Sequence, residues 1–439
     1  MKRITIILTL IILLLFVCCS FESDRIDLSD DSFYAFYMGE TPSNAPPAST
    51  DGYIFDHADC TNGASLTWDN NTWSATVNGL TTTRTKCTLY FALDNHTNLV
   101  IARLAGNADP TSTALIDNGT DASGCTNTLA YDDFGNLRFV GANPCNYVTF
   151  NGETAGWRII GIIDNRVKLI RNEFIGSYSW DTSASEVNGG GGINQWGESG
   201  SYTGADLMKL LNPGFNTNLA EDSSGNQISG TYVNNSLYWN GQSGNCYNKY
   251  NNAYTTCDFT STGLSSEAKS MIASTTWHLG SQGSNDYTAS GLGTSKKFYE
   301  YERSSNTGKI CTSGSFCDDK VARTTEWEGY IGLMSPSDYG YAVGGSVRNT
   351  CLSKSLRNYN TDNCVSNDWL HKGTYEWMMS PHADSTYARD VFYVDNTGHV
   401  YSPTVGYAYA SRPALNLISG VKVSSGNGSS NNPYVLSLN

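Results

Sequence analysis

The stretch that decides the fold lies near the C-terminus and reads YEWMMSP (375–381), ARDVFYVDNTGHVYSP (388–403) and YAYASRPALNL (407–417). Its aromatic and β-branched residues, broken by turn residues, predict paired strands that close a compact domain. Two earlier segments have the same character, GWRIIGIIDNRVKLIRN (156–172) and EWEGYIGLMSPSDYGYA (326–342). We expect them to be the partners of the C-terminal strands, and the first to form two strands around the turn Asp164-Asn165.

Three short helices are indicated by their start signals. Thr203 opens a capping-box pattern before ADLMKLLN, which Pro213 should end. Ser265 is the expected cap of SEAKSMIASTTW. Ser335 begins the third helix, with proline at the first helical position and Asp338 near the positive end of the helix dipole.

Composition favours strands and long polar loops over helices. The 439 residues include 43 glycines, 12% aromatic residues and only 15% charged residues. We therefore predict a β-rich α+β fold: an irregular mixed domain with long loops, preceded by a small β-sandwich-like module. The formal net charge of −14 would repel nucleic-acid phosphates and anionic lipid, so neither is an expected partner.

Twelve cysteines constrain the compartment. Two end the leader, and the other ten fall in neighbouring pairs that each lie within one loop or hairpin: Cys60/Cys87, Cys125/Cys145, Cys246/Cys257, Cys311/Cys317 and Cys351/Cys364. An even number in an exported chain favours disulfides, although spacing does not determine their connectivity. The chain has no Cys-x-x-Cys pair and no closely spaced histidine pair, so we expect no metal site.

The N-terminus, residues 1–19, is an export leader. Two basic residues precede an apolar run from Ile4 to Val17, which is short for a bilayer span. The string before Cys18 resembles a bacterial lipobox, and Cys19 is an alternative site of lipidation. Three interpretations stay open: a lipoprotein, an uncleaved membrane anchor or a secreted protein. Each places the body of the chain outside the cytoplasm, and the first two hold it at the outer face of the cytoplasmic membrane.

Four segments are expected after the leader. Residues 20–51 are polar and rich in proline and serine, so we predict a spacer. Residues 52–95 carry strand patterns and form the small β module. Residues 96–124 lack clear periodicity and are expected to form a connector, and residues 125–439 form the main domain.

Motifs that carry chemistry are scarce. No G-x-S-x-G or H-E-x-x-H string occurs, and the S-x-x-K string at Ser266 lacks the motifs that accompany it in penicillin-binding proteins. Acidic pairs occur, but neighbours in sequence do not by themselves place two carboxylates across a cleft. We therefore predict no catalysis, and keep an enzyme acting on cell-wall or extracellular polysaccharide as an alternative.

Tryptophan and tyrosine are frequent among asparagine, aspartate and glycine. Aromatic faces stack on sugar rings, and nearby carboxylates bind hydroxyl groups or calcium. The candidate ligand-binding residues are Trp180, Asp181, Trp196, Asp368, Trp369 and Trp377, with Trp239 and Tyr401 as further members of this set. The alternative is that each of these rings belongs to the core. Calcium stays open as a cofactor, and no other cofactor is indicated.

The main domain resembles a family of uncharacterised surface proteins of Gram-positive bacteria and their wall-less relatives. The matching strings cover most of residues 125–439: NLRFVGANPCNYVTFNGETAGWRIIGI, GADLMKLLNPGF, NNSLYWN, EWEGYIGLMSPSDYGYA, NDWL, SRPALNL and SGNGSSNNPYVL. The module ending in TKCTLYF is similar to β repeats that precede such domains. The resemblance implies a lipid or hydrophobic N-terminal anchor.

A more distant resemblance is to the C-type-lectin-like and formylglycine-generating-enzyme superfamily. It rests on a tryptophan-rich strand, a D-x-x-G hairpin within 391–400 and the Arg412-Pro413 strand. The calcium lectins' Trp-Asn-Asp string is absent, because residues 367–369 read Asn-Asp-Trp. The resemblance therefore implies a lectin-like fold without calcium ligands.

Together these features predict a surface-anchored, extracytoplasmic binding protein. Its C-terminal domain would recognise a glycan or a protein ligand at a cell surface, in an adhesion-like role, and the membrane would be contacted only through the N-terminal anchor. A structural or assembly component of the cell surface is a second alternative.

Overall fold

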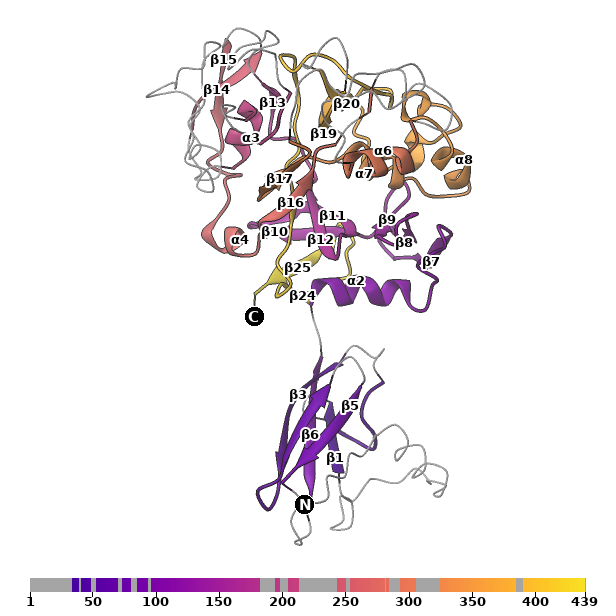
Figure 1. Ribbon diagram of the computed structural model, residues 1–439, viewed down its shortest axis with the longest axis vertical. Coiled ribbons are helices and arrows are strands. Elements are labelled where there is room, and N and C mark those ends of the chain that lie inside the picture. Colours follow the sequence, from indigo (N-terminus) through magenta and orange to yellow (C-terminus); the bar gives the residue numbers. More distant parts are fainter. Residues whose placement is uncertain are drawn as a thin grey trace. The chain divides into compact units, whose positions relative to one another are not determined.

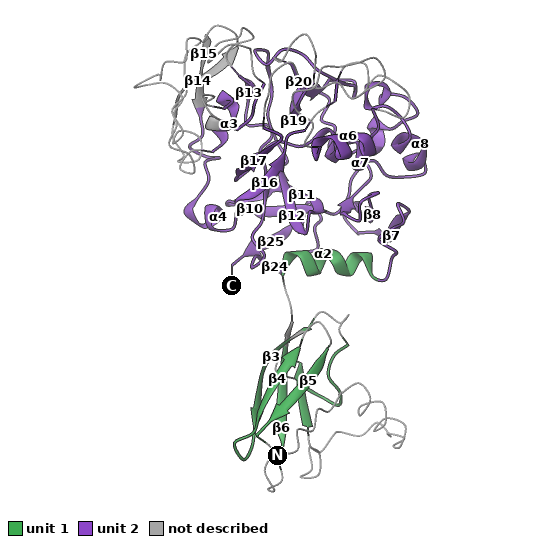
Figure 2. Ribbon diagram, in the orientation of Figure 1, with its two compact units in different colours: residues 1–106 green, residues 107–439 purple. Residues whose placement is uncertain are grey.

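The computed structural model describes residues 34–38, 41–48, 53–69, 73–79, 85–93, 96–181, 194–197, 204–212, 243–249, 253–280, 282–283, 293–304, 324–383 and 390–438. The chain divides into two compact units, residues 1–106 and residues 107–439 (Figure 2). Strands dominate, helices are short and loops are long. The fold is thus the β-rich, irregular α+β fold that composition predicts.

The N-terminal unit is a small two-layer β structure. Its described strands are β1 (Tyr34–Met38), β2 (Thr41–Ser43), β3 (Tyr53–Cys60), β4 (Ser65–Asp69), β5 (Ser74–Asn78) and β6 (Cys87–Leu93). One sheet has the order β2-β1-β6-β3, and the β4–β5 hairpin packs on it through Trp68 and Val77. The core is centred on Leu89 and Phe91 of β6, and the Cys60–Cys87 disulfide joins β3 to β6. The prediction of a disulfide-bonded β module is therefore confirmed.

The prediction of a spacer over residues 20–51 is wrong for β1 and β2. The segment YAFYM pairs with β6 in parallel, and Tyr34 and Phe36 pack against the core. Pro47 also contributes, because its carbonyl accepts a hydrogen bond from Trp73 Nε1 at 2.8 Å. This strand was not predicted because the neighbouring residues are rich in proline and serine. Its partner strand also lies about fifty residues later in the chain.

The connector expected over residues 96–124 contains regular structure. Helix α2 (Thr97–Ala105) buries Thr97, Ile101 and Ala105, which recur on one helical face. Strand β7 (Leu115–Thr120) pairs with β8 (Thr126–Tyr131). The segment therefore contains a helix and a strand that were not predicted. The helix has only a narrow apolar stripe, so the polar composition of the segment gave no clear periodicity.

The large sheet of the C-terminal unit is built around the two strands predicted on either side of Asp164-Asn165. These are β11 (Glu153–Ile163) and β12 (Arg166–Arg171). Both turn residues have positive φ, 50° and 63°, as a two-residue hairpin turn matching the strand twist requires. The path is β18-β23-β12-β11-β10-β25-β24, with β9 also pairing with β11. Figure 1 labels β9 to β12, β24 and β25 of this sheet. The other strands are β9 (Leu137–Phe139), β10 (Tyr147–Phe150), β18 (Ile331–Gly332), β23 (Ala414–Asn416), β24 (Lys422–Ser425) and β25 (Tyr434–Ser437).

The C-terminal stretch, residues 375–417, contributes strands to two sheets. Its last strand, β23, pairs with β12 and β18, which confirms the predicted partners. Its earlier strands form a separate sheet of order β13-β22-β19-β20-β21. The strands from this stretch are β19 (Glu376–Pro381), β20 (Val391–Val394), β21 (Val400–Tyr401) and β22 (Ala408–Ala410), and the sheet is completed by β13 (Ser177–Ser179).

All three predicted helices form. They are α3 (Asp206–Leu211), α4 (Ser266–Ser270) and α7 (Pro336–Tyr341). Ser265 caps α4 as predicted, whereas α3 begins after Ala205 without a side-chain cap. Helix α4 ends early, because residues predicted to continue it form β16 (Thr275–His278), which pairs with β17 (Glu326–Gly329). The other described helices are α6 (Ser295–Glu302), α8 (Arg348–Leu352), η1 (Leu356–Asn358) and η2 (Val365–Asn367).

Three of the five predicted disulfides lie among the described residues: Cys60–Cys87, Cys125–Cys145 and Cys351–Cys364. Cys246 and Cys257 lie on the paired strands β14 (Ser243–Lys249) and β15 (Ala253–Asp258), whose side chains are outside the described set. Cys311, Cys317 and the leader cysteines Cys18 and Cys19 are also outside it. Within the described part of the chain, every helix is too short or too polar to cross a membrane.

Candidate functional site

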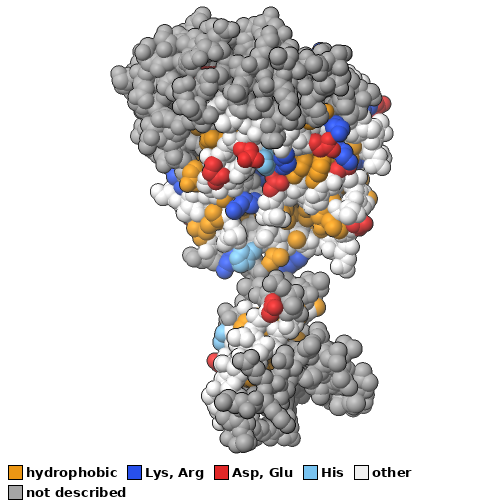
Figure 3. Space-filling view, viewed as in Figure 1, with side chains coloured by type: hydrophobic (Ala, Val, Ile, Leu, Met, Phe, Trp, Pro, Cys, Tyr) orange, Lys and Arg blue, Asp and Glu red, His pale blue; other side chains and the backbone are white. Residues whose placement is uncertain are grey.

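A polar cavity of about 350 Å³ opens in the C-terminal unit. Its lining comes from the ends of β9, β11, β12, β16, β17 and β23 and from α6 and α7. Figure 3 shows acidic and basic side chains gathered beside a histidine on the described face of this unit. The cavity therefore brings together charged groups from segments that are far apart in the sequence.

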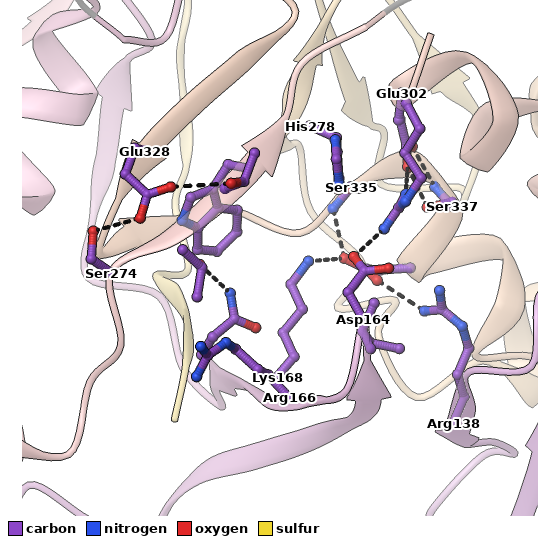
Figure 4. A pocket seen from close by; sticks show the side chains of 17 residues that line it. Arg138, Asp164, Arg166, Lys168, Ser274, His278, Glu302, Glu328, Ser335 and Ser337 are labelled. Atoms are coloured by element: carbon purple, nitrogen blue, oxygen red, sulfur yellow. Dashed lines mark hydrogen bonds and ion pairs between the residues drawn. The ribbon is translucent and has the colours of Figure 1, made fainter. Parts of the chain in front are cut away.

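Asp338 is the centre of a buried ion cluster in this cavity, and Figure 4 labels its partners Arg138 and Lys168. Its Oδ1 accepts a hydrogen bond from Arg138 Nη1 at 2.9 Å, and its Oδ2 accepts one from Lys168 Nζ at 2.6 Å. Arg138 Nε donates to Asp132 behind it, at 2.8 Å. The capping box of α7 orients the carboxylate, because Asp338 Oδ2 also accepts from the backbone N–H of Ser335 at 3.0 Å.

The charges around Asp338 keep it ionised. Burial alone raises the pKa of this carboxyl, but the charges of Lys168 and Arg138 outweigh burial and hold the pKa well below its usual range. Both oxygens are occupied by cations and a backbone N–H. Asp338 thus stabilises the cavity and is not free to attack a substrate.

Glu302, at the end of α6, is the carboxyl that can change its protonation state. Its Oε1 accepts from the backbone N–H of Ser337 at 3.1 Å, and its Oε2 accepts from Ser337 Oγ at 2.5 Å. Burial raises the pKa of Glu302 to about 7, although Arg303 and Ser337 act in the opposite direction. A buried carboxyl with this pKa can hold or release a proton near neutral pH.

A second ion pair closes the side of the cavity near the β11–β12 turn. Arg303 Nη2 donates to Asp164 Oδ2 at 2.5 Å, and Tyr299 OH donates to Asp164 Oδ1 at 3.0 Å. Arg303 also lies over the Tyr299 ring, 3.5 Å from its centroid. Burial and the charge of Arg303 lower the pKa of His278 on the adjoining wall, so this histidine is neutral at physiological pH.

The opposite wall offers hydroxyl groups and a carboxylate. Glu328 on β17 accepts hydrogen bonds from Ser274 Oγ at 3.0 Å and Thr276 Oγ1 at 3.1 Å. Trp277 belongs to the same lining but is buried, with Lys168 Nζ 5.1 Å from its ring centroid. This wall can donate and accept hydrogen bonds, but it offers no open aromatic face.

The tryptophans that the sequence suggested as ligand contacts belong to the core, which corrects the prediction. Trp180, Trp196 and Trp377 are fully buried, and Trp369 is 3% exposed. The indole N–H groups of Trp180, Trp369 and Trp377 donate to backbone carbonyls of distant segments. A buried ring has no face to present to a sugar, so composition alone misjudged these positions.

The two aspartates of that set are also not gathered into a site. Asp368 is buried, and it accepts hydrogen bonds from Tyr359 OH at 2.9 Å and from the backbone N–H of Leu370 at 2.9 Å. Burial raises the pKa of Asp368 to about 8. Asp181 is half-buried after β13, and its backbone N–H donates to Val405. Trp239 lies outside the described residues.

Five tyrosines that lie at least partly open to solvent form what we call the tyrosine row: Tyr375, Tyr393, Tyr401, Tyr407 and Tyr409. Three lie on β20, β21 and β22 of the smaller sheet, and the other two lie immediately before β19 and β22. Only Tyr401 was among the residues singled out from sequence. In the sequence, the spacing of two residues between Tyr407 and Tyr409 could have indicated that they share one face of a strand. Their contact with the other tyrosines of the row depends on strand pairing, which the sequence does not show.

Rings in the row are stacked on one another. The centroids of Tyr393 and Tyr409 are 4.9 Å apart, those of Tyr375 and Tyr409 5.3 Å, and those of Tyr407 and Tyr409 5.7 Å. The rings of the last pair are nearly parallel, at 5°. Tyr375 is 42% exposed and Tyr407 is 48% exposed, so these two side chains present surface to solvent.

Among the described residues, no three histidine, cysteine, aspartate or glutamate side chains are grouped so that they could hold a metal ion. Comparison with known proteins finds no match, either among protein-family models, among curated proteins or among solved structures. The fold and the two features above therefore define a general class only: a disulfide-containing, β-rich α+β protein with a charged cavity and an exposed tyrosine row.

Proposed function

We propose that this chain is a surface-anchored, extracytoplasmic binding protein whose C-terminal unit recognises a glycan or a protein ligand. The observation that carries the proposal is the tyrosine row. Tyrosine supplies a large, rigid contact area at little cost in side-chain entropy, and its hydroxyl adds hydrogen bonds. Four of the rings are stacked and Tyr401 lies tilted against Tyr393, so the rings hold one another in place and little further ordering is required when a ligand binds.

The extracytoplasmic location rests on the cysteines and the leader. The three described disulfides are typical of proteins that fold in an oxidising compartment. The apolar leader with Cys18 and Cys19 supports anchoring at the outer face of the membrane. The resemblance to Gram-positive surface proteins agrees with this location and assigns no activity, and a lectin-like fold remains part of the proposal.

The test is ligand binding by residues 20–439, a fragment that lacks the leader and retains β1 and β2. The fragment is applied to a glycan array, with calcium and with chelator, and to isolated cell-surface proteins. Replacing both Tyr375 and Tyr407 with alanine should weaken binding at least about tenfold, because the two most exposed rings of the row are lost. Phe134→Ala removes a ring that is 40% exposed outside the row, and it is the matched control.

Each outcome has a defined meaning. Binding to glycans that depends on the row identifies a glycan ligand, and the chelator arm decides whether calcium takes part. Binding only to surface proteins identifies a protein ligand. The corresponding Tyr→Phe substitutions retain the rings, and they separate ring contact from hydroxyl bonding. Binding unchanged by the alanine substitutions, or no binding in any arm, would contradict the proposal.

A second candidate function is hydrolysis of a polysaccharide. It is favoured by one observation: Glu302 and Asp338 line one cavity, and their pKa values are shifted in opposite directions. Against it, both oxygens of Asp338 are held by cations, so Asp338 is not available as the nucleophile or base that a pair of carboxylates requires. Release of reducing ends from cell-wall polysaccharide, abolished by Glu302→Gln, would favour this candidate over binding alone.

A further inference from the structure

The cavity holds two charges that the protein itself leaves unmatched. Eight side chains in its lining carry a formal charge at neutral pH in their usual states: Arg138, Asp164, Arg166, Lys168, Glu302, Arg303, Glu328 and Asp338. Arg138 and Lys168 pair with Asp338, and Arg303 pairs with Asp164 and lies 3.8 Å from Glu302. Within the described part of the chain, Arg166 and Glu328 have no ion-pair partner.

Arg166 is the first residue of β12, directly after the β11–β12 turn. The turn projects it from the end of the hairpin, and its side chain is exposed. It makes no hydrogen bond or ion pair with any described residue, although Asp164 lies only two positions earlier. Asp164 is instead held by Arg303 and Tyr299. The guanidinium of Arg166 therefore has all its donors available to a ligand.

Glu328 differs from a freely moving surface glutamate because two hydroxyls orient it. Ser274 and Thr276 each donate to one of its carboxylate oxygens, so the group is fixed without being neutralised. In Figure 4 Glu328 and Arg166 are seen to arise from different strands that border the same cavity. The cavity thus presents one fixed anion and one available cation on separate wall elements.

We propose that this cavity binds a small zwitterion, a molecule that carries both a carboxylate and an ammonium group. The carboxylate of the ligand would accept two parallel hydrogen bonds from the planar guanidinium of Arg166. The ammonium would bind Glu328, and the hydroxyl-lined wall would accept the remaining polar groups. A cavity of about 350 Å³ accommodates an amino acid or a dipeptide. This site is separate from the tyrosine row, and the inference does not depend on the function proposed for the row.

The experiment is isothermal titration of residues 20–439 with free L-amino acids and zwitterionic dipeptides at millimolar concentration. Each compound that binds is retested as its N-acetyl and carboxamide derivatives. We expect either modification to weaken binding at least about tenfold, because each removes one of the two matched charges. Arg166→Gln should abolish the preference for the acid over the amide, and Glu328→Gln should abolish the preference for the free amine over the N-acetyl form.

The controls separate this site from other effects. Glu267→Gln on α4 and Arg103→Gln on α2 change exposed charges outside the cavity, and they should leave binding unaltered. Replacing Tyr375 and Tyr407 with alanine should also leave it unaltered, so failure here is distinct from failure of the proposed function. The inference is overturned if no zwitterion binds. It is equally overturned if Arg166→Gln and Glu328→Gln proteins, folded by circular dichroism, bind as the wild type does.

Discussion

Asp338 shows how one residue acquires a role that its sequence neighbours only partly indicate. Its place three residues after Ser335 predicted a capping box, and the box forms. The same carboxylate also pairs with Arg138 and Lys168, 200 and 170 positions away in the chain. Removing one partner of a fully buried ion pair is far more costly than removing a surface pair, because the remaining charge stays desolvated. Asp338 is therefore both a local and a tertiary anchor.

Glu302 should make the stability of the protein depend on pH. Its pKa is about 7 in the folded protein and lies near 4.5 in the unfolded chain, so the folded state binds the proton more tightly. The stabilisation of the folded state by this bound proton is complete below pH 4.5 and is lost as pH rises through 7. The loss amounts to about 3 kcal/mol of the free energy of unfolding. Urea unfolding at pH 5 and pH 8 measures it.

Glu302→Gln removes the titrating group while keeping the side-chain size. The variant should lose less stability than the wild type between pH 5 and pH 8. Glu300→Gln, on the same helix, is the control, because Glu300 is partly exposed and pairs with Lys297. If Glu302→Gln and wild-type proteins have the same pH dependence, then Glu302 does not carry the proton that we assign to it.

Among the elements, two hairpins repeat one local design. In the β8–β9 hairpin, Asp132 Oδ1 accepts from the backbone N–H groups of Phe134 and Asn136. In the β20–β21 hairpin, Asp395 Oδ1 accepts from those of Thr397 and His399. Each turn has glycine with positive φ at the fourth position, which a side chain would strain. The D-x-x-G signal in the sequence therefore identifies a self-contained turn.

The Cys60–Cys87 disulfide should be needed by the small N-terminal unit. The bond joins the edge strand β3 to the central strand β6 across 27 residues, in a unit whose fully buried core is small. Replacing both cysteines with serine should destabilise the unit by about 2–4 kcal/mol, because the unfolded segment gains conformational freedom. Hydrogen exchange read by mass spectrometry over residues 34–93 localises the effect.

The matched control replaces Cys351 and Cys364 with serine. That pair lies in the C-terminal unit, so amide exchange over residues 34–93 should stay as in the wild type. Unchanged exchange in the Cys60→Ser/Cys87→Ser protein would show that the apolar contacts of β6 suffice without the disulfide.

For the molecule as a whole, we propose that the predicted leader determines where both units reside. We expect the full chain expressed in a Gram-positive host to partition into the detergent phase as a lipoprotein. Replacing both Cys18 and Cys19 with serine should move it out of that phase, because the acyl chains supply the membrane affinity. Peptide mapping without reduction should find the five predicted disulfides.

Two results would change this interpretation. Retention of the doubly substituted protein in the membrane favours an uncleaved anchor, and release of the wild type into the medium favours secretion. Free thiols at the ten paired cysteines would contradict the extracytoplasmic location, because an oxidising compartment converts well-placed thiols to disulfides.

Sequence patterns predicted local structure well wherever the signal lay within a few residues. The Asp164-Asn165 turn, the Ser265 cap, the Ser335 capping box and the Cys60–Cys87 link all depend on near neighbours in sequence or on one strand pair. Where a segment depends on a distant partner, the prediction was wrong. Strand β1 was taken for spacer because its partner β6 is remote.

The chain by itself determined the β-rich character, the turns and the caps, since these follow from conformational preference and short-range hydrogen bonds. Only the tertiary structure decided which aromatic rings are inside and which charges meet. Trp180 was a candidate contact and Tyr407 was not, yet Trp180 is fully buried and Tyr407 is 48% exposed. Burial and the pairing of distant charges depend on how strands assemble into sheets, and a one-residue change of register would reverse each strand's faces.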